Sequence, residues 1–230
     1  MPAVLVNTAA VLCGSLIGIL FSSRLSDHLR DAVMKALGLC TILIGVQSAL
    51  KTQELLCVIL CMVIGTVIGE LLHIDDGIEH AGDAIKAKLP KGKAGGSCFT
   101  EGFVSASILF CIGSMTIMGS LEAGIRHDYS IIYAKSMMDF VSSMAFGAAM
   151  GFGVTCSALF VLVFQGVLTL LAGVIGSALS EAAVTEMSAV GGVILIGMAL
   201  NMLECTNRRI RVANMLPAIF LPILWMAIIK

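Results

Sequence analysis

The stretch FCIGSMTIMGSLEAG, residues 110–124, is apolar enough to lie in a lipid bilayer, yet glycines and hydroxyl groups occur throughout it. A helix that only anchored the chain would consist mainly of leucine, isoleucine and valine. This composition favours a helix that bends, breaks or packs very closely. Broken helices persist at membrane depth only where protein buries them or where they line a cavity, and transporters often hold their substrate there. We therefore expect the functional centre at this stretch and at the next apolar segment, 133–153.

The composition of the whole chain indicates a membrane protein. Of its 230 residues, 58% are hydrophobic and 13% are charged, and the mean hydropathy is +1.02. Soluble domains are typically about 45–50% apolar and about 25% charged. The net charge of −1 argues against nucleic-acid binding, which needs a clustered basic face. The eight cysteines form no CxxC pair, so neither a zinc ribbon nor a thioredoxin-like site has its signature. We expect no metal, no cofactor and no catalytic residues.

The apolar segments predict an all-α polytopic bundle. A bilayer core of about 30 Å needs about 20 apolar residues in a helix. Eight segments meet or approach this length, and seven spans would remain if one of the two most polar segments failed to cross. We treat the chain as one transmembrane domain with a first unit (1–72), a loop (73–100), central polar spans (101–152) and a second unit (153–230). The eight segments are 2–22, 33–50, 55–72, 101–122, 131–152, 155–179, 187–204 and 212–229.

The distribution of basic residues between the spans predicts the orientation, because cytoplasmic loops are rich in lysine and arginine. Most of the basic residues outside the spans fall in odd-numbered loops. These loops should therefore be cytoplasmic, with both termini outside if the spans number eight. The odd-numbered loops carry Arg24, Arg30, Lys86, Lys88, Lys91, Lys93, Arg208, Arg209 and Arg211, and the opposite side carries Lys51, Arg126 and Lys230.

Two apolar segments resemble each other. Residues 34–50 and 187–203 both contain the sequence ILIG and would form the second and seventh spans. An offset of five spans would place the two copies in opposite senses across the membrane. Inverted-topology repeats of this kind are typical of alternating-access transporters, although apolar segments also match by chance.

Lys135 and Asp139 are charged residues inside the fifth span, and their spacing of four places them on one helical face. Each costs about 2.5–3.5 kcal/mol or more at the centre of a span. One interpretation is a coupling site, in which Asp139 binds a cation or proton and Lys135 alternately takes its charge. A second is a buried ion pair that fixes helix packing. In a third, Lys135 lies near the interface and extends its side chain to water.

The fourth span adds further candidates for binding an ion or solute. Thr116 and Ser120 share one helical face, and a break near Gly119 would bring Glu122 to the same cavity as Asp139. Without a break there, Glu122 is a carboxylate at the end of a span. Small hydroxylated residues also commonly pack membrane helices together.

Four amide side chains lie in apolar surroundings and must face protein or water, because an unsatisfied amide in lipid costs several kcal/mol. We expect Asn7, Gln165 and Asn201 to orient or complete the site. Asn214 precedes Pro217 by three residues, and Pro217 removes a helical hydrogen bond. This pair therefore predicts a hinge in the eighth span.

The third span ends in a small-xxx-small pattern, Gly65 and Gly69, followed by Glu70. This pattern brings two helices close together, either within one chain or in a homo-oligomer. Glu70 and His73 have the spacing found in di-metal helical bundles. A second such pair is missing, so a solvated acidic helix is the simpler interpretation. With Gly113 and Gly119, these glycines are the expected packing or hinge positions.

The longest connection, 73–100, has an apolar residue every three or four positions from Ile74 to Leu89, and Pro90 follows. This pattern predicts a short amphipathic helix on the cytoplasmic membrane surface. A solvated connector would have the same pattern.

Several motifs spread along the chain resemble one known family, the bacterial membrane proteins catalogued as domain-of-unknown-function 554. The resemblance implies a polytopic protein of the bacterial inner membrane, and it brings no established activity. The motifs are NTAAVLCGSLIG (7–18), IGTVIGELLHI (64–74), FCIGSMTIMGSLEAG (110–124), YAKSMMDF (133–140), FGAAMGFGV (146–154), FQG (164–166), AVGGVILIGMALNML (189–203) and RVANMLPA (211–218).

These observations lead to one main hypothesis, a small secondary transporter for an ion or small polar solute, in contact with the lipid bilayer. A first rival is a membrane enzyme acting near Glu70, His73 and Asp76, which form no strong catalytic motif. A second is a non-catalytic membrane partner or sensor that docks through the loop 73–100.

Overall fold

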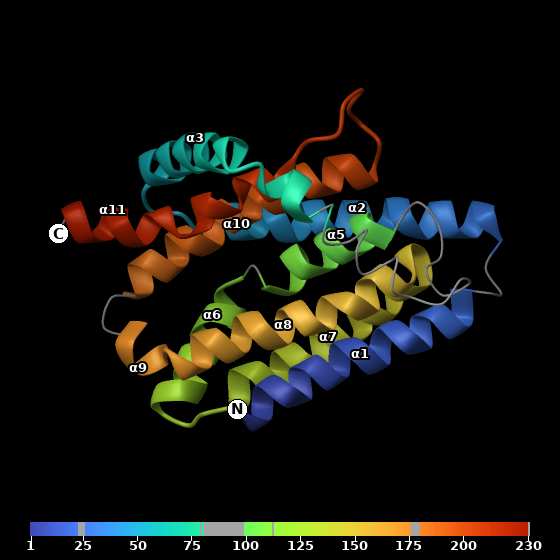
Figure 1. Ribbon diagram of the computed structural model, residues 1–230, viewed down its shortest axis with the longest axis horizontal. Helices are drawn as coiled ribbons and strands as arrows, with labels where there is room; N and C mark the ends of the chain where they lie inside the picture. Colours follow the sequence, from blue (N-terminus) through green and yellow to red (C-terminus); the bar gives the residue numbers. More distant parts are fainter. Residues whose placement is uncertain (23–25, 79, 81–98, 112, 176–179, 230) are drawn as a thin grey trace.

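The computed structural model describes residues 1–22, 26–78, 80, 99–111, 113–175 and 180–229, and within these residues the chain is all helical, without strands (Figure 1). Within the described residues, each predicted apolar segment overlaps one helix or two helices in succession. The helices are α1 (Pro2–Ser22), α2 (Asp27–Ala49), α3 (Leu55–Leu71), α5 (Phe99–Cys111), α6 (Ser114–Ile125), α7 (Ser130–Met150), α8 (Phe152–Leu170), α9 (Ala172–Ile175), α10 (Glu181–Met202), the 3₁₀ helix η1 (Val212–Ile219) and α11 (Leu221–Ile229).

Four of the described helices are long and apolar enough to cross a membrane: α1, α2, α8 and α10. The bent pair α5–α6 makes a fifth candidate if it counts as one span. The eight predicted spans are therefore not confirmed. The apolar helix α3 has only 17 residues, and α7 has 21 residues but contains two charged ones. Large apolar side chains are exposed on several helices, as expected of surfaces that face lipid; examples are Leu20, Leu43, Leu71, Met137 and Leu170.

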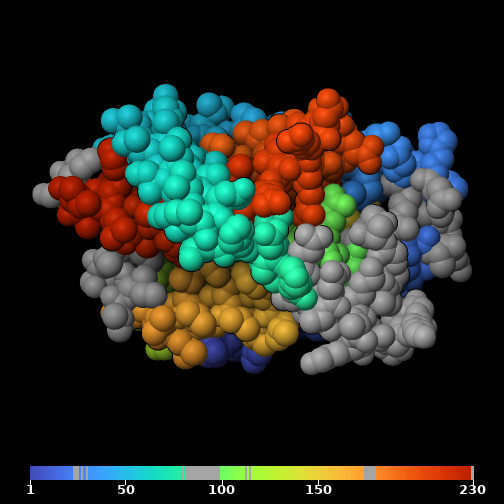
Figure 2. Space-filling model, turned by 45° about the horizontal axis from the view of Figure 1, so that its top comes forward, coloured from blue at the N-terminus to red at the C-terminus, as the bar shows by residue number. Residues whose placement is uncertain are grey.

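The helices pack in pairs that are distant in sequence. Helix α1 lies against α7 and α8, α2 against α10, α5 against α8, and α3 against η1. Successive long helices run in alternating directions in Figure 1. Figure 2 shows α3 beside the connection from α10 to η1 on one face of the molecule.

Glycines bring α1 unusually close to α7. A β-carbon on Gly14 would lie 2.4 Å from the carbonyl oxygen of Phe140, and one on Gly18 would lie 2.0 Å from that of Met144. Any larger residue would push the two helices apart. This contact helps to place the amide side chain of α1, Asn7, beside α7.

The glycines of the third predicted span also act in packing, and they do so within the chain. A β-carbon on Gly65 would lie 2.3 Å from the Cα of Ala218, and one on Gly69 would lie 1.9 Å from the carbonyl oxygen of Asn214. The pattern therefore packs α3 against η1 of the same chain. Pro217 lies inside η1, so the predicted disturbance of the last segment takes the form of a 3₁₀ helix followed by the short α11.

The expected break in the fourth segment exists, but its position differs from the prediction. Helices α5 and α6 meet at a bend of 58°, next to Gly113, whose φ of 159° is rare for residues with a β-carbon. Gly119 instead lies inside α6, where a β-carbon would meet Ile131 and Ile132 at 3.0 Å. Gly119 is therefore a packing position between α6 and α7.

The two similar apolar segments form α2 and α10, which lie side by side and run in opposite directions (Figure 1). They touch through glycines, because a β-carbon on Gly192 would lie 2.5 Å from the carbonyl oxygen of Gly45. The inverted repeat as such is not confirmed.

Candidate functional site

An ion pair lies in the interior of the bundle at the middle of α7. Lys135 Nζ donates a short hydrogen bond to Asp139 Oδ2, one helical turn away, and the two side chains are only 8% and 10% exposed. The interpretation in which Lys135 extends to water is therefore wrong. The coupling site and the packing ion pair both agree with this geometry.

Two amides extend the ion pair into the interior. Asn7 Nδ2 donates to Asp139 Oδ2 and to Gln165 Oε1, each at 3.1 Å. Asn7 and Gln165 are both fully buried. Lys135, Asp139, Asn7 and Gln165, which we call the polar chain, thus connect α7, α1 and α8. The sequence predicted all four as site residues, and the structure brings them together.

Some buried polar atoms have no partner among the described residues, and two of them belong to the polar chain. These atoms include Asn7 Oδ1, Gln165 Nε2 and Ser120 Oγ. A buried polar group without a hydrogen bond costs about 1–3 kcal/mol, so native proteins rarely keep one without a reason. Ser120 is fully buried in α6, one turn before Gly124, which packs against Thr169 of α8.

A cavity of about 190 Å³ lies on the other side of the ion pair. Its wall includes Thr116 at the start of α6 and Lys51 in the turn between α2 and α3. Lys51 is exposed, so the cavity connects the buried ion pair with the surface. The lining residues are Ile44, Ser48, Lys51, Leu109, Phe110, Gly113, Met115, Thr116, Lys135, Met138, Asp139 and Ser142.

Thr116 stabilises the break as well as lining the cavity. Its hydroxyl donates a 3.1 Å hydrogen bond to the carbonyl oxygen of Phe110, near the end of α5. The backbone N–H of Thr116 bonds to the carbonyl oxygen of Gly113 at 3.1 Å. One residue therefore joins the end of α5 to the beginning of α6 across the bend.

Glu122 lies outside this site, contrary to the prediction. Because α6 continues through Gly119, Glu122 is more than one turn beyond Thr116 and does not line the cavity. Its carboxylate pairs with Arg126 at 3.2 Å, and its side chain is 22% exposed.

Asn201 also lies outside the site and has a local structural role. Its Nδ2 donates to the carbonyl oxygen of Ile210 at 2.8 Å, and its Oδ1 accepts from the backbone N–H of Ile210 at 2.9 Å. These two bonds close the connection between α10 and η1.

A second polar cluster joins the end of α3 to η1. Asn214 Nδ2 donates to Glu70 Oε2 through a short hydrogen bond, and Asn214 Oδ1 accepts from the backbone N–H of Asp75 at 2.6 Å. Arg211 lies 3.7 Å from Glu70, and His73 lies 3.4 Å from Asp76. Glu70 is thus held by Asn214 and Arg211. Among the described residues, no group of three or more His, Cys, Asp or Glu side chains is arranged to hold a metal ion.

Sequence reasoning missed one buried carboxylate, Glu186. It is 1% exposed at the start of α10 and accepts hydrogen bonds from Thr52 Oγ1 at 2.5 Å and from the backbone N–H of Gln53 at 2.8 Å. These bonds hold the α2–α3 turn that carries Lys51. The expected span began at residue 187, one position later, so Glu186 counted as part of a loop.

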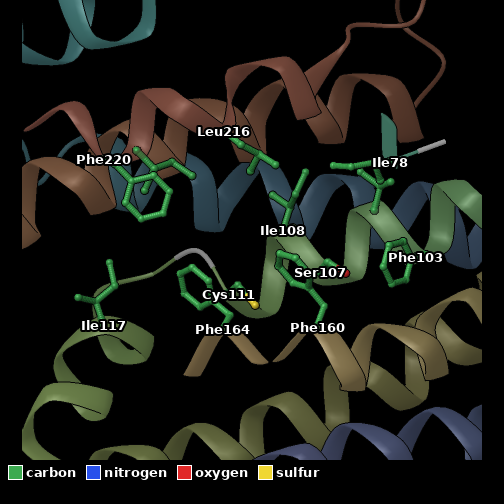
Figure 3. Close-up of a pocket in the computed structure, with 12 residues that line it drawn as sticks. Ile78, Phe103, Ser107, Ile108, Cys111, Ile117, Phe160, Phe164, Leu216 and Phe220 are labelled. Carbon is green, nitrogen blue, oxygen red and sulfur yellow. The ribbon is translucent and has the colours of Figure 1, made fainter. Parts of the chain in front are cut away.

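An apolar cavity of about 200 Å³ lies on the opposite side of the break (Figure 3). Phe103 and Ile108 of α5, Phe160 and Phe164 of α8, and Leu216 of η1 contribute to its wall. Cys111 and Ile117, on the two helices that flank the break, also face this cavity. The helices on the two sides of the break therefore line two separate cavities.

The predicted amphipathic helix in the loop 73–100 falls mainly on residues 79 and 81–98, which lie outside the described residues. The described part contains a helical turn at 74–78, and Ile78 lines the apolar cavity.

Comparisons with known proteins give a consistent result. The model of the family described as "Protein of unknown function (DUF554)" matches residues 2–227. The uncharacterized membrane protein YdfK of Bacillus subtilis (strain 168) is 28% identical over 222 residues, covering 94% of this chain and 91% of the relative. The uncharacterized protein YqgA of Escherichia coli (strain K12) is 30% identical over 220 residues, covering 94% and 92%. No solved structure matches the chain significantly.

Proposed function

The chain belongs to the DUF554 family of proteins of unknown function, and from this premise and its buried polar chain we propose that it is a small secondary transporter. Its cargo would be an ion or small polar solute, moved by alternating access. The apolar helices and the relative named as a membrane protein indicate a protein embedded in a lipid bilayer. The transport role rests on the site itself.

The observation that carries the proposal is the Lys135–Asp139 pair at the wall of a cavity that reaches the surface. Ionisable residues within membrane segments are expensive, and they commonly mark ion or substrate pathways. A pair that only fixed helix packing would have no need of a cavity beside it. The cavity gives a solute access to the charges.

The pair also suggests how binding and movement are coupled. In the described arrangement Lys135 neutralises Asp139. A proton or cation bound to Asp139 would take over that role and release the Lys135 ammonium toward the cavity. Binding at one group therefore changes the charge that a solute meets. The α5–α6 break, whose helices line two separate cavities, is the element best placed to respond.

The arrangement of the helices supports two inverted units. Helix α1 packs against α8, α2 against α10, and α3 against η1, and each pair runs in opposite directions in Figure 1. This is the relationship expected if α1–α3 and α8–α11 were inverted copies around the central α5–α7. In this proposal the odd-numbered loops face the cytoplasm of a bacterium, and the protein lies in the inner membrane.

Transport by purified protein in liposomes is the direct test. Asp139→Asn should abolish solute-dependent ion or proton flux, measured with fluorescent dyes enclosed in the liposomes. The matched control is Asp31→Asn, because Asp31 and Lys35 form the same i,i+4 pair at 2.6 Å but are 57% and 56% exposed. Full flux in a correctly folded Asp139→Asn protein would contradict the proposal.

A further inference from the structure

We infer that the cavity beside the ion pair binds a small monovalent carboxylate, an inference that rests on the proposed transport function and specifies its substrate class. Among the residues that the structure describes, the formal charges that line the cavity are Lys51, Lys135 and Asp139. Two cations and one anion leave an excess of one positive charge. A ligand with a single negative charge balances this excess.

The hydrogen-bonding capacity of Lys135 points in the same direction. An ammonium group has three N–H donors and no acceptor. Among the described residues, Lys135 Nζ has one acceptor, Asp139. Burial of unpaired N–H groups on a charged side chain is costly, so the remaining donors need oxygen atoms, which either water or a ligand in the cavity can supply. A carboxylate supplies both the oxygen atoms and the charge.

Asp139 offers a cation less than a full carboxylate in this arrangement, because one of its two oxygens is already engaged. Its Oδ2 already accepts from Lys135 and from Asn7, and Lys51 lies in the wall of the same cavity. A cation entering the cavity would meet two lysines and a carboxylate that is already neutralised. The cavity therefore favours an anion while the ion pair is closed.

The rest of the wall fits a short carboxylate that carries an apolar group. Hydroxyl donors come from Ser48 and Ser142, and the positive end of the α6 dipole begins at Gly113. The apolar part of the wall consists of Leu109, Phe110 and Met138. The cavity has a volume of about 190 Å³, which leaves room for a ligand larger than a single water molecule. Propionate offers one carboxylate and a short apolar group that match this wall, whereas gluconate carries hydroxyl groups where the wall is apolar.

Thermal unfolding of the purified full-length protein in detergent tests the inference. Sodium propionate should raise the melting temperature with saturation, nitrate should raise it less because it gains nothing from the apolar wall, and sodium gluconate should not raise it. Choline propionate should act like sodium propionate, because the anion is the ligand. Lys51→Gln should weaken the apparent affinity about fivefold, as expected for loss of one charge-assisted contact, while Lys35→Gln, on the exposed pair of α2, should leave it unchanged.

Two results obtained with propionate would overturn the inference. One is a melting-temperature shift that follows the cation and is the same with propionate and gluconate. The other is a propionate shift that is unchanged both in Lys51→Gln and in the neutral double variant Lys135→Gln/Asp139→Asn. A cation- or pH-dependent shift that requires Asp139, without any anion effect, would remove the carboxylate and leave the transport proposal standing. Propionate binding without flux in liposomes would leave the carboxylate inference standing and remove the transport proposal.

Discussion

Asn7 in α1 donates a 3.1 Å hydrogen bond to Asp139 in α7, across 132 positions of sequence and in the interior of the bundle. The same Nδ2 atom also reaches Gln165 of α8. One amide therefore links three helices at the level of the ion pair. Its position depends on the glycine contact between α1 and α7, which allows no larger side chain.

Replacing Asn7 should lower both the free energy of unfolding and the affinity of the cavity for propionate. In Asn7→Ala, Asp139 loses a buried donor and Gln165 Oε1 loses its partner, so we expect a loss of about 1–3 kcal/mol in the free energy of unfolding. Denaturant unfolding in detergent measures the loss. Thr8→Ala in the same helix is the control, because the Thr8 hydroxyl bonds only to the carbonyl of Val4 in its own helix. Equal stability of the Asn7 and Thr8 variants would contradict this prediction.

Removing only the lysine of the ion pair should be worse than neutralising both residues. Lys135→Met leaves a buried carboxylate uncompensated, which typically costs about 3–5 kcal/mol. Lys135→Met/Asp139→Asn removes both charges and should recover most of that loss. Thermal unfolding of the two variants gives the comparison. A double variant no more stable than the single one would show that the pair is not coupled.

The close contact of α1 with α7 gives a third prediction. Gly18→Ala would place a β-carbon 2.0 Å from the carbonyl oxygen of Met144, so the helices must separate and Asn7 should lose contact with Asp139. Melting temperature and propionate binding should both fall. Gly166→Ala is the control, because its β-carbon would meet its nearest atom, the end of Met1, at 4.0 Å. A Gly18 variant that behaves like the Gly166 variant would contradict the packing argument.

Glu186 provides a prediction outside the polar chain. Its carboxylate accepts from Thr52 and Gln53, and Gln has one carbonyl oxygen in place of two carboxylate oxygens. Glu186→Gln should therefore destabilise the α2–α3 turn by about 1–3 kcal/mol and increase hydrogen exchange at residues 50–54. Glu181→Gln, at an exposed position in the first turn of the same helix, should change neither quantity. Unaltered exchange in the Glu186 variant would count against its role in holding the turn.

The sequence predicted those features that depend on neighbouring residues in the chain. The spacing of Lys135 and Asp139 predicted their pairing, and the polar composition of residues 110–124 predicted a broken helix. The predicted position of the break was wrong because the sequence does not distinguish Gly113 from Gly119. Only the structure shows that Gly113 has an unusual φ and that Gly119 packs against α7.

Sequence patterns could not predict which residues far apart in the chain form hydrogen bonds with each other. Asn7, Gln165 and Asn201 are all amides in apolar surroundings, and composition could not separate them. Asn201 finds its partner nine positions away, in the backbone of Ile210, whereas Asn7 meets Asp139 only because glycines allow α1 and α7 to touch. Glu186 escaped attention for the same reason, since its donors are contributed by a turn more than 130 positions earlier.

The glycine contact between α1 and α7 also limits which helices can move relative to each other in the proposed transport cycle. Residues larger than glycine do not fit between these two helices, so in the proposed transport cycle we expect α1 and α7 to move together and to carry Asn7, Lys135 and Asp139 with them. The broken segment α5–α6 faces this pair and lines a cavity on each side. In that cycle, the site would open and close by displacement of the broken segment relative to the α1–α7 pair.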